Sequence, residues 1–264
     1  IMGDAPLPLV VDETLRALGF EVLEGYGSTE QCVSALRRPQ RNFPGAVGRV
    51  LPGVHVSIRH TPGETWHGRK IGEIVVSGEN VFAGYFTDLR SLPANVAASS
   101  SYLTGDLGTV DARGNLQVLG RKVHAFRLRS GELIIPELIE NVLRGCRYVG
   151  RVLVFGAGRE RTLAVVVPDF HALLLWASKK DKKTYHENYA TNPEKHARFW
   201  GNLVSAEAKD LFARKFTGLL TESGLPHYAH PNELIVLPRP FHRGAELTLT
   251  LKPRRAVIAQ KYLY

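Results

Sequence analysis

The hydrophobic pattern changes near Arg121, and no other feature of the sequence constrains the fold as strongly. Before Arg121, short apolar segments such as Val54–Ile58 and Ile74–Val76 are bounded by Gly or Pro. Such segments, with apolar residues at every second position, are typical of strands in a small antiparallel sheet. After Arg121, apolar residues recur at helical spacing, and we expect the first helix there to begin at Pro136 and to be closed by Gly145. The sequence therefore predicts two units of different kinds.

The other expected elements follow from the same two periodicities. They are, in chain order, a helix that ends at Gly19, a strand over 20–23 followed by a Gly-rich turn, strands over 107–110 and 116–119 around a turn at 111–115, strands over 151–155 and 163–167, a largely helical stretch over 169–222 with an irregular middle near 191–193, and a strand over 234–237. We expect the α+β class, with a β-barrel-like part over residues 1–120 and a small α+β domain over residues 121–264.

The composition is that of a protein able to bury a core, with 44% apolar and 22% charged residues among 264. No apolar run approaches the roughly 18 residues of a membrane-spanning helix. Residues 1–19 carry acidic side chains where a signal peptide would be basic and then apolar. Cys32 and Cys146 have no second Cys or His beside them at metal-ligand spacing. We therefore expect a soluble protein of the cytoplasm with reduced thiols.

The formal charge of +9 predicts a partner that carries negative charge. Nucleic acid, an acidic membrane surface contacted peripherally and a phosphorylated cofactor all meet that condition. Lysines form a tight run only between Lys179 and Lys183, and no aromatic residues are interleaved at an RNA-binding spacing. This disfavours nucleic acid and leaves the membrane surface and the cofactor.

A glycine-rich segment, Glu24–Glu30, contains the residue types of a nucleotide site. Its glycines allow close approach to the backbone. The Tyr26 ring can stack on a purine, the Thr29 hydroxyl can donate to a phosphate, and the Glu30 carboxylate can hold Mg²⁺ between phosphates. A Gly-rich turn with a capping Thr and Glu explains this segment alone equally well.

Further motifs follow in a fixed order along the chain. The segments are Gly3–Leu7, Gly25–Glu30, Gly72–Tyr85, Tyr102–Asp106, Gly120–Glu140 and Leu247–Arg255. The ordered set resembles the adenylate-forming superfamily of acyl-CoA synthetases, luciferases and peptide-synthetase adenylation domains. The amino-acid sequences of Arg127–Glu132 and of the tail around Lys252 are most similar to those of long-chain fatty acyl-CoA synthetases. The resemblance extends from Gly3 to Tyr262, and its strength lies in the order of the motifs.

The resemblance implies roles for the matching residues. The implied nucleotide contacts are Gly3, Ala5, Gly25, Tyr26 and Gly27 around the adenine, Thr29 at a phosphate, and Asp106 and Arg121 at the ribose. Lys252, Thr29 and Glu30 are the implied catalytic residues, with Glu30 also the Mg²⁺ ligand, and Ser130, Gly131 and Glu132 form the loop at the tunnel for the thiol of coenzyme A. Judged as single residues, Asp106 is also explained as a turn residue, and Arg121 and Lys252 as solvated cations.

The implied function is that of a long-chain fatty acid–CoA ligase. A carboxylate attacks the α-phosphorus of ATP, giving acyl-AMP and pyrophosphate, and the thiol of CoA then displaces AMP. Residues 1–120 correspond to the end of the large AMP-binding domain, and residues 121–264 to the mobile C-terminal domain, which turns about a hinge near Arg121. Val123 and His124 stand where the family usually has an acidic residue or Lys.

The loop that holds the β- and γ-phosphates in the family has no counterpart in this sequence. We therefore expect the chain to be part of a longer or split polypeptide, to depend on the N-terminal half of the fold, and to be inactive alone. Two alternatives remain open. One is a ligase that passes the acyl group to a carrier protein, and the other is a non-catalytic scaffold subunit or pseudoenzyme derived from the same fold.

Overall fold

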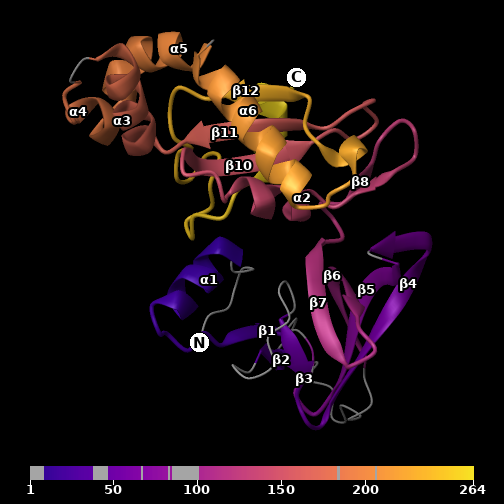
Figure 1. Ribbon diagram of the computed structural model, residues 1–264. Coiled ribbons are helices and arrows are strands. Elements are labelled where there is room, and N and C mark those ends of the chain that lie inside the picture. The colour runs from indigo at the N-terminus through magenta and orange to yellow at the C-terminus, as the bar shows by residue number, and fades with distance from the viewer. Residues whose placement is uncertain are drawn as a thin grey trace, which may run out of the picture. The chain divides into compact units, whose positions relative to one another are not determined.

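The computed structural model describes residues 9–37, 47–66, 68–82, 84, 101–182, 185–205 and 207–264. The chain divides into two compact units, Ile1–Ala125 (unit 1) and Phe126–Tyr264 (unit 2). Figure 1 shows that unit 1 is mainly strands and that unit 2 combines a sheet with helices. The expected mixture of helices and strands is confirmed.

The described residues of unit 1 form one helix and a seven-stranded antiparallel sheet. The elements are α1 (Leu9–Ala17), β1 (Glu24–Ser28), β2 (Cys32–Arg37), β3 (Gly48–Val50), β4 (Val54–Trp66), β5 (Arg69–Gly78), β6 (Tyr102–Val110) and β7 (Asn115–Arg121). The strand order is β1-β2-β3-β7-β6-β5-β4. Among the described residues the two edge strands, β1 and β4, do not pair with each other, so this sheet is open and not a closed barrel.

The turn between β6 and β7 is fixed by one carboxylate. Asp111 accepts hydrogen bonds from the backbone N–H of Arg113 (2.9 Å) and of Asn115 (2.8 Å), and from the Asn115 side chain (2.8 Å). An Asp that bonds the backbone N–H groups that follow it is a common way to build a tight turn. The hairpin expected around residues 111–115 is thereby confirmed.

The strand expected over residues 20–23 is wrong. The structure begins β1 at Glu24, so the first five residues of the glycine-rich segment, Glu24–Ser28, are themselves a strand, paired with β2. Buried charges explain the shift, because Glu24 lies 3.3 Å from Arg37 of β2 (Oε2 to Nη2) and Arg37 also binds Asp12 of α1 at 2.9 Å. A buried charge is retained where it is paired, and periodicity of apolar residues does not reveal such pairs.

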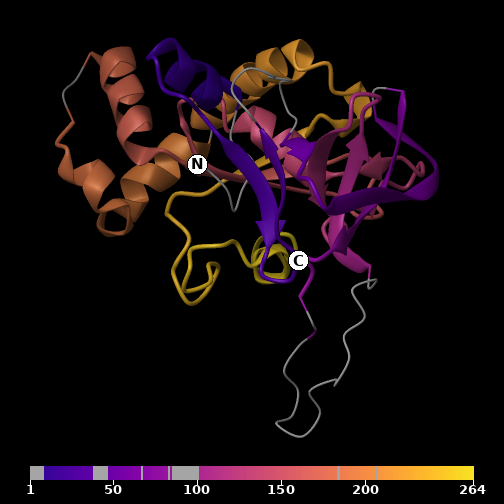
Figure 2. The ribbon, with the colours of Figure 1, turned by 90° about the horizontal axis from the view of Figure 1, so that it is seen from below.

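Unit 2 places a three-stranded sheet among helices. The elements are β8 (Phe126–Arg127), β9 (Leu133–Ile134), α2 (Pro136–Leu143), β10 (Val149–Phe155), β11 (Leu163–Pro168), α3 (Phe170–Asp181), α4 (Asn188–Thr191), η1 (Pro193–His196), α5 (Ala197–Ser205), α6 (Glu207–Glu222), η2 (His227–Ala229), β12 (Glu233–Val236) and α7 (Arg255–Tyr262). The sheet order is β10-β11-β12, antiparallel between the first two strands and parallel between the last two. In Figures 1 and 2, α3, α4 and α5 lie together at one side of this unit.

The local sequence explains where these elements begin. Pro136 starts α2, as expected, because its fixed φ and missing N–H suit the first helical position. Asp169 caps α3 by accepting the backbone N–H of Ala172 at 2.9 Å. Every residue of β11 is buried, so this strand is the centre of the core of unit 2. None of the helices in the described ranges is long and apolar enough to cross a membrane.

Candidate functional site

Three of the predicted site residues of unit 1 come together around the carboxylate of Asp106. The Tyr26 hydroxyl donates to Asp106 Oδ2 at 2.7 Å, and Arg121 Nε lies 3.1 Å from Asp106 Oδ1. Tyr26 belongs to β1, Asp106 to β6 and Arg121 to β7. Asp106 and Arg121 face each other in the register of their two strands. Motifs far apart in the sequence therefore converge on one acceptor.

Hydrogen bonds of the neighbouring Thr104 fix the backbone at Asp106. Thr104 Oγ1 donates to the Ile74 carbonyl at 2.9 Å and accepts the backbone N–H of Asp106 at 3.1 Å. Gly105 has a φ of +72°, which L side chains rarely adopt, so a glycine is required between them. Lys122 closes the arrangement, because its backbone N–H donates to the Gly105 carbonyl at 2.8 Å.

Tyr26 is buried, with 8% of its surface exposed, and packs in the apolar core of unit 1. Burial, together with the charge of Asp106, raises the pKa of the Tyr26 hydroxyl far above its usual value. The hydroxyl therefore stays protonated at neutral pH and serves as a hydrogen-bond donor. Stacking of this ring on adenine stays a prediction.

Thr29 and Glu30 lie in the turn between β1 and β2. Ser28 Oγ donates to Glu30 Oε2 at 2.7 Å, and the Glu30 N–H donates back to Ser28 Oγ at 3.3 Å. Thr29 is exposed. Among the described residues no cluster of three or more His, Cys, Asp or Glu could hold a metal ion. A single carboxylate nevertheless fits Mg²⁺, which proteins often hold with one or two carboxylates plus substrate phosphates.

The predicted loop of Ser130, Gly131 and Glu132 joins β8 to β9 in unit 2. Ser130 Oγ donates to the Glu132 carboxylate, and this hydrogen bond holds the pKa of Glu132 below its usual range. Arg127 Nη1 donates to the Gly131 carbonyl at 2.6 Å. Gly131 has a φ of +101° and open space around it, so the turn requires glycine for its backbone and not for packing.

Lys252 lies in the loop that precedes α7. The Thr248 N–H donates to the Lys252 carbonyl at 2.8 Å, and the Lys252 N–H donates to Thr248 Oγ1 at 3.0 Å. Leu251 has a φ of +63°, in the left-handed region, although it is not a glycine. Lys252 is exposed. The structure thus places Tyr26, Thr29, Glu30, Asp106 and Arg121 in unit 1 and Ser130, Gly131, Glu132 and Lys252 in unit 2, while Gly3 and Ala5 lie outside the described residues.

Sequence reasoning missed several polar residues that support these sites. Gln31 and Ser34 are fully buried behind the turn of Glu30, and Asn80 Nδ2 donates to the Gln31 carbonyl at 2.6 Å. Glu73, within the Gly72–Tyr85 motif, accepts Lys122 Nζ at 2.7 Å. The signal for Glu73 was available, because both partners occur in recognised motifs. No local pattern points to Gln31 or Asn80, which meet only in the fold.

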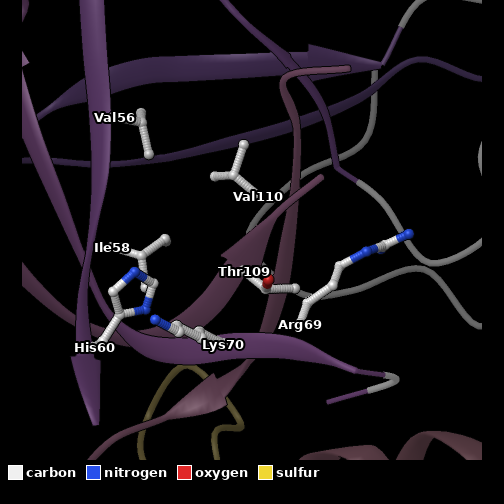
Figure 3. A pocket seen from close by; sticks show the side chains of 7 residues that line it. All are labelled: Val56, Ile58, His60, Arg69, Lys70, Thr109 and Val110. Atoms are coloured by element: carbon white, nitrogen blue, oxygen red, sulfur yellow. The ribbon is translucent and has the colours of Figure 1, made fainter. Parts of the chain in front are cut away.

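A cavity of about 400 Å³ lies on the sheet of unit 1, over β4, β5 and β6 (Figure 3). Its lining combines apolar Val56, Ile58 and Val110 and polar Thr109 with basic His60, Arg69 and Lys70. None of the predicted site residues that the structure describes lines it. The Asp106 cluster is therefore a separate feature of the same unit.

Comparison with known proteins identifies relatives of this chain. The family model described as AMP-binding enzyme matches residues 1–86. Long-chain-fatty-acid–CoA ligase 6 of Rattus norvegicus is 35% identical over 99% of this chain, and long-chain-fatty-acid–CoA ligase 1 of Homo sapiens is 34% identical over 97%. The chain spans 36% and 35% of the lengths of these two relatives.

Solved structures show the same fold. The adenylation domain of a carboxylate reductase from Mycobacterium chelonae matches 98% of this chain and 36% of its own, with a TM-score of 0.71 and 25% identity. O-succinylbenzoate coenzyme A synthetase from Bacillus subtilis, in complex with ATP and magnesium ion, matches 97% of this chain and 45% of its own, with a TM-score of 0.65 and 26% identity. The chain therefore belongs to the AMP-binding enzyme family, and its sequence relatives within that family include long-chain-fatty-acid–CoA ligases.

Proposed function

We propose that this chain is part of a long-chain fatty acid–CoA ligase. The convergence of Tyr26 and Arg121 on the buried carboxylate of Asp106 carries the proposal, because a carboxylate fixed in this way is suited to accept the two ribose hydroxyls of a nucleotide. The ligase relatives align over nearly all of this chain and support the same function. Since the chain spans about 36% of their length, the proposed activity belongs to the complete ligase fold.

In the proposed nucleotide site, Asp106 accepts both ribose hydroxyls. A carboxylate offers roughly four acceptor positions, so donation by Tyr26 and Arg121 is compatible with further donors. Arg121 places a positive charge beside the ribose. Thr29, exposed in the turn, donates to a phosphate oxygen. The residues present thus fit a nucleotide bound with its ribose on β6 and its phosphates near the β1–β2 turn.

The proposed first half-reaction joins the fatty acid carboxylate to AMP. A carboxylate oxygen attacks the α-phosphorus, and the bond between that phosphorus and the bridging oxygen of pyrophosphate breaks. Lys252 neutralises the negative charge that develops there, which is an electrostatic contribution that requires no proton transfer. Glu30 would hold Mg²⁺, and the charge of that ion would stabilise the leaving pyrophosphate.

In the proposed second half-reaction, the thiol of CoA attacks the acyl carbon, and the bond to AMP breaks. The thiol gives up its proton to water as the thioester forms, and AMP leaves as its phosphate anion. The loop of Ser130, Gly131 and Glu132 would line the path of the thiol. Unit 2 would act as the mobile C-terminal domain, turning at the segment after Arg121 so that the lysine and this loop serve in turn. Location in the cytoplasm and peripheral contact with membrane lipid are part of the same proposal.

A comparison of acyl acceptors tests this function. The complete protein that contains this chain is assayed for exchange of labelled pyrophosphate into ATP in the presence of hexadecanoic acid or acetate. Acyl transfer is then measured to CoA and to a phosphopantetheine carrier protein. We expect exchange that depends on hexadecanoic acid and transfer to CoA. Transfer to the carrier protein alone would support the alternative ligase, and absence of exchange would support the scaffold.

A further inference from the structure

Glu246 is a fully buried carboxylate beside the loop that carries Lys252. Its Oε1 accepts hydrogen bonds from Arg239 Nη2 (2.8 Å), Lys261 Nζ (2.9 Å) and the Tyr262 hydroxyl (2.9 Å). Its Oε2 accepts the backbone N–H of His242 at 3.1 Å. These donors come from the segment after β12 and from α7, so a single side chain joins the two segments that flank the loop.

Glu246 also stands at the point where the loop leaves and re-enters the body of unit 2. Its carbonyl accepts the backbone N–H of Arg254 at 2.8 Å. The next residue, Leu247, forms an antiparallel bridge with Pro253 and is buried in the core. Residues 246–247 and 253–254 thus form a paired neck, and residues 248–252 project from it as the lysine loop.

The lysine loop contains an unfavourable backbone conformation that contacts with other residues must stabilise. Leu251, directly before Lys252, has a φ of +63° although it is 49% exposed and gains little from packing. A non-glycine residue in the left-handed region is costly and persists only where surrounding structure determines it. The hydrogen bonds from Thr248 and the paired neck are the support that the structure provides.

The charge of Glu246 matters as well as its size. Although burial opposes ionisation, hydrogen bonds from Lys261 and Arg239 hold the pKa of Glu246 well below its usual range, so it is ionised at neutral pH. An amide of the same size would turn a donor group toward donors and would leave Arg239 and Lys261 without their shared anion. We expect such a change to loosen the neck.

We propose that Glu246 is a positioning residue for Lys252, fixing the neck of the lysine loop so that the ammonium group is presented in one place. This inference rests on the proposed function, in which Lys252 acts during adenylation. Glu246 touches no substrate in the proposal and acts only through the loop.

The test compares both half-reactions in the complete protein carrying Glu246→Gln. We expect kcat for adenylation to fall about tenfold or more, because a misplaced charge stabilises the transition state poorly. The KM for ATP should stay within about twofold, since the proposed ribose contacts are in unit 1. Thioester formation from supplied acyl-AMP should also stay within about twofold.

Amide hydrogen exchange, followed by mass spectrometry, supplies a readout that does not depend on activity. In Glu246→Gln, amides of residues 247–254 should exchange about tenfold faster or more, while those of β10 and β11 stay unchanged. Glu207→Gln, which breaks an exposed ion pair with Lys180, is the matched control and should change neither readout. If Glu246→Gln does not fold, Tyr262→Phe removes one donor and keeps the ring, and should produce the same pattern with smaller changes.

The outcomes separate this inference from the function on which it rests. Normal adenylation in Glu246→Gln, or equal slowing of both half-reactions together with faster exchange throughout unit 2, would overturn the positioning role. If Lys252→Ala slows adenylation while Glu246→Gln does not, only the positioning role fails. If Lys252→Ala leaves adenylation unchanged, the proposed role of Lys252 fails, and the positioning role fails with it.

Discussion

At the scale of single residues, two carboxylates of the proposed nucleotide site are held by partners that fix their direction. Asp106 accepts a hydrogen bond from Tyr26 and forms an ion pair with Arg121, and Glu30 accepts a hydrogen bond from Ser28. Preorganised charges stabilise a developing anion without reorganising during the reaction, and in many enzymes no other effect accelerates the reaction as much. The proposed chemistry therefore makes definite demands on individual side chains.

The first prediction concerns Lys252→Ala in the complete protein. Adenylation, measured as pyrophosphate exchange, should fall roughly a hundredfold or more, the size typical of losing one preorganised charge at a developing anion. Thioester formation from supplied acyl-AMP should change much less, because the proposed domain rotation removes Lys252 from that step. Lys209→Ala, which removes an exposed lysine of α6, is the control and should leave both steps unchanged. Equal losses in both steps would remove Lys252 from the active site.

The second prediction concerns the ion pair between the partly buried Arg255 and the buried Glu140. Arg255 Nη2 donates to Glu140 Oε1, and the Val154 N–H donates to the same carboxylate oxygen at 2.7 Å. Arg255→Ala leaves a buried carboxylate without its cation, so the free energy of unfolding of unit 2 should fall by about 3–5 kcal/mol. Arg129→Ala, which removes an exposed partner of Glu160, should change it by less than about 1 kcal/mol.

The pH dependence of that variant provides its own check. Burial already raises the pKa of Glu140 above the usual 4.5, against the opposing effect of Arg255. Without Arg255 the pKa should rise further, so the folded protein binds more protons than the unfolded chain as pH increases above 4.5. The stability of Arg255→Ala should therefore decline between about pH 5 and pH 8 more steeply than that of the unmodified protein. A loss of equal size at both pH values would contradict this account.

At the scale of elements, the sequence correctly predicted the helices and strands whose local sequence signals agree with the fold. The helix from Pro136 is present, because apolar residues at helical spacing follow the proline. The strands near 151–155, 163–167 and 234–237 are present, because each is a short apolar run bounded by turn residues. The start of β1 could not be predicted, since it depends on the pairing of Glu24 with Arg37 across two strands. Nor could the Glu246 network, which joins Arg239 to Lys261 only after folding.

The third prediction uses two glycines of the same strand, β1. A Cβ at Gly27 would lie 1.8 Å from the Cys32 carbonyl oxygen, so Gly27→Ala requires the backbone of the β1–β2 turn to move. We expect the free energy of unfolding of unit 1 to fall by about 1–3 kcal/mol, measured by urea denaturation. A Cβ at Gly25 would meet nothing closer than 3.7 Å, so Gly25→Ala should cost less than about 1 kcal/mol. Similar effects of the two changes would contradict the steric explanation.

At the scale of the whole molecule, the chain passes from one compact unit to the other between Ala125 and Phe126, a few residues after Arg121. Each of the two units has an apolar core of its own. The assignment of unit 2 as the mobile domain stays a proposal. The separate core of unit 2 leads to a prediction that can be tested without an activity assay.

Residues 126–264 should fold without the rest of the chain. Their core includes Trp200, Phe212 and Ile258, each 0% exposed, packed around the fully buried strand β11. A unit of this size with one core should unfold in a single cooperative transition, with an enthalpy on the order of 100 kcal/mol near 60 °C. Scanning calorimetry measures that transition, and fluorescence of the buried Trp200 should report it at the same temperature.

The 264-residue chain is the control, and it should show the same transition at the same temperature if unit 2 is autonomous. A broad transition without cooperativity in residues 126–264, or one displaced by more than a few degrees from its counterpart in the longer chain, would mean that unit 1 contributes to the stability of unit 2. Rotation about the segment after Arg121 would then have to break stabilising contacts, and the proposed domain movement between the two half-reactions would carry a free-energy cost that an autonomous unit avoids.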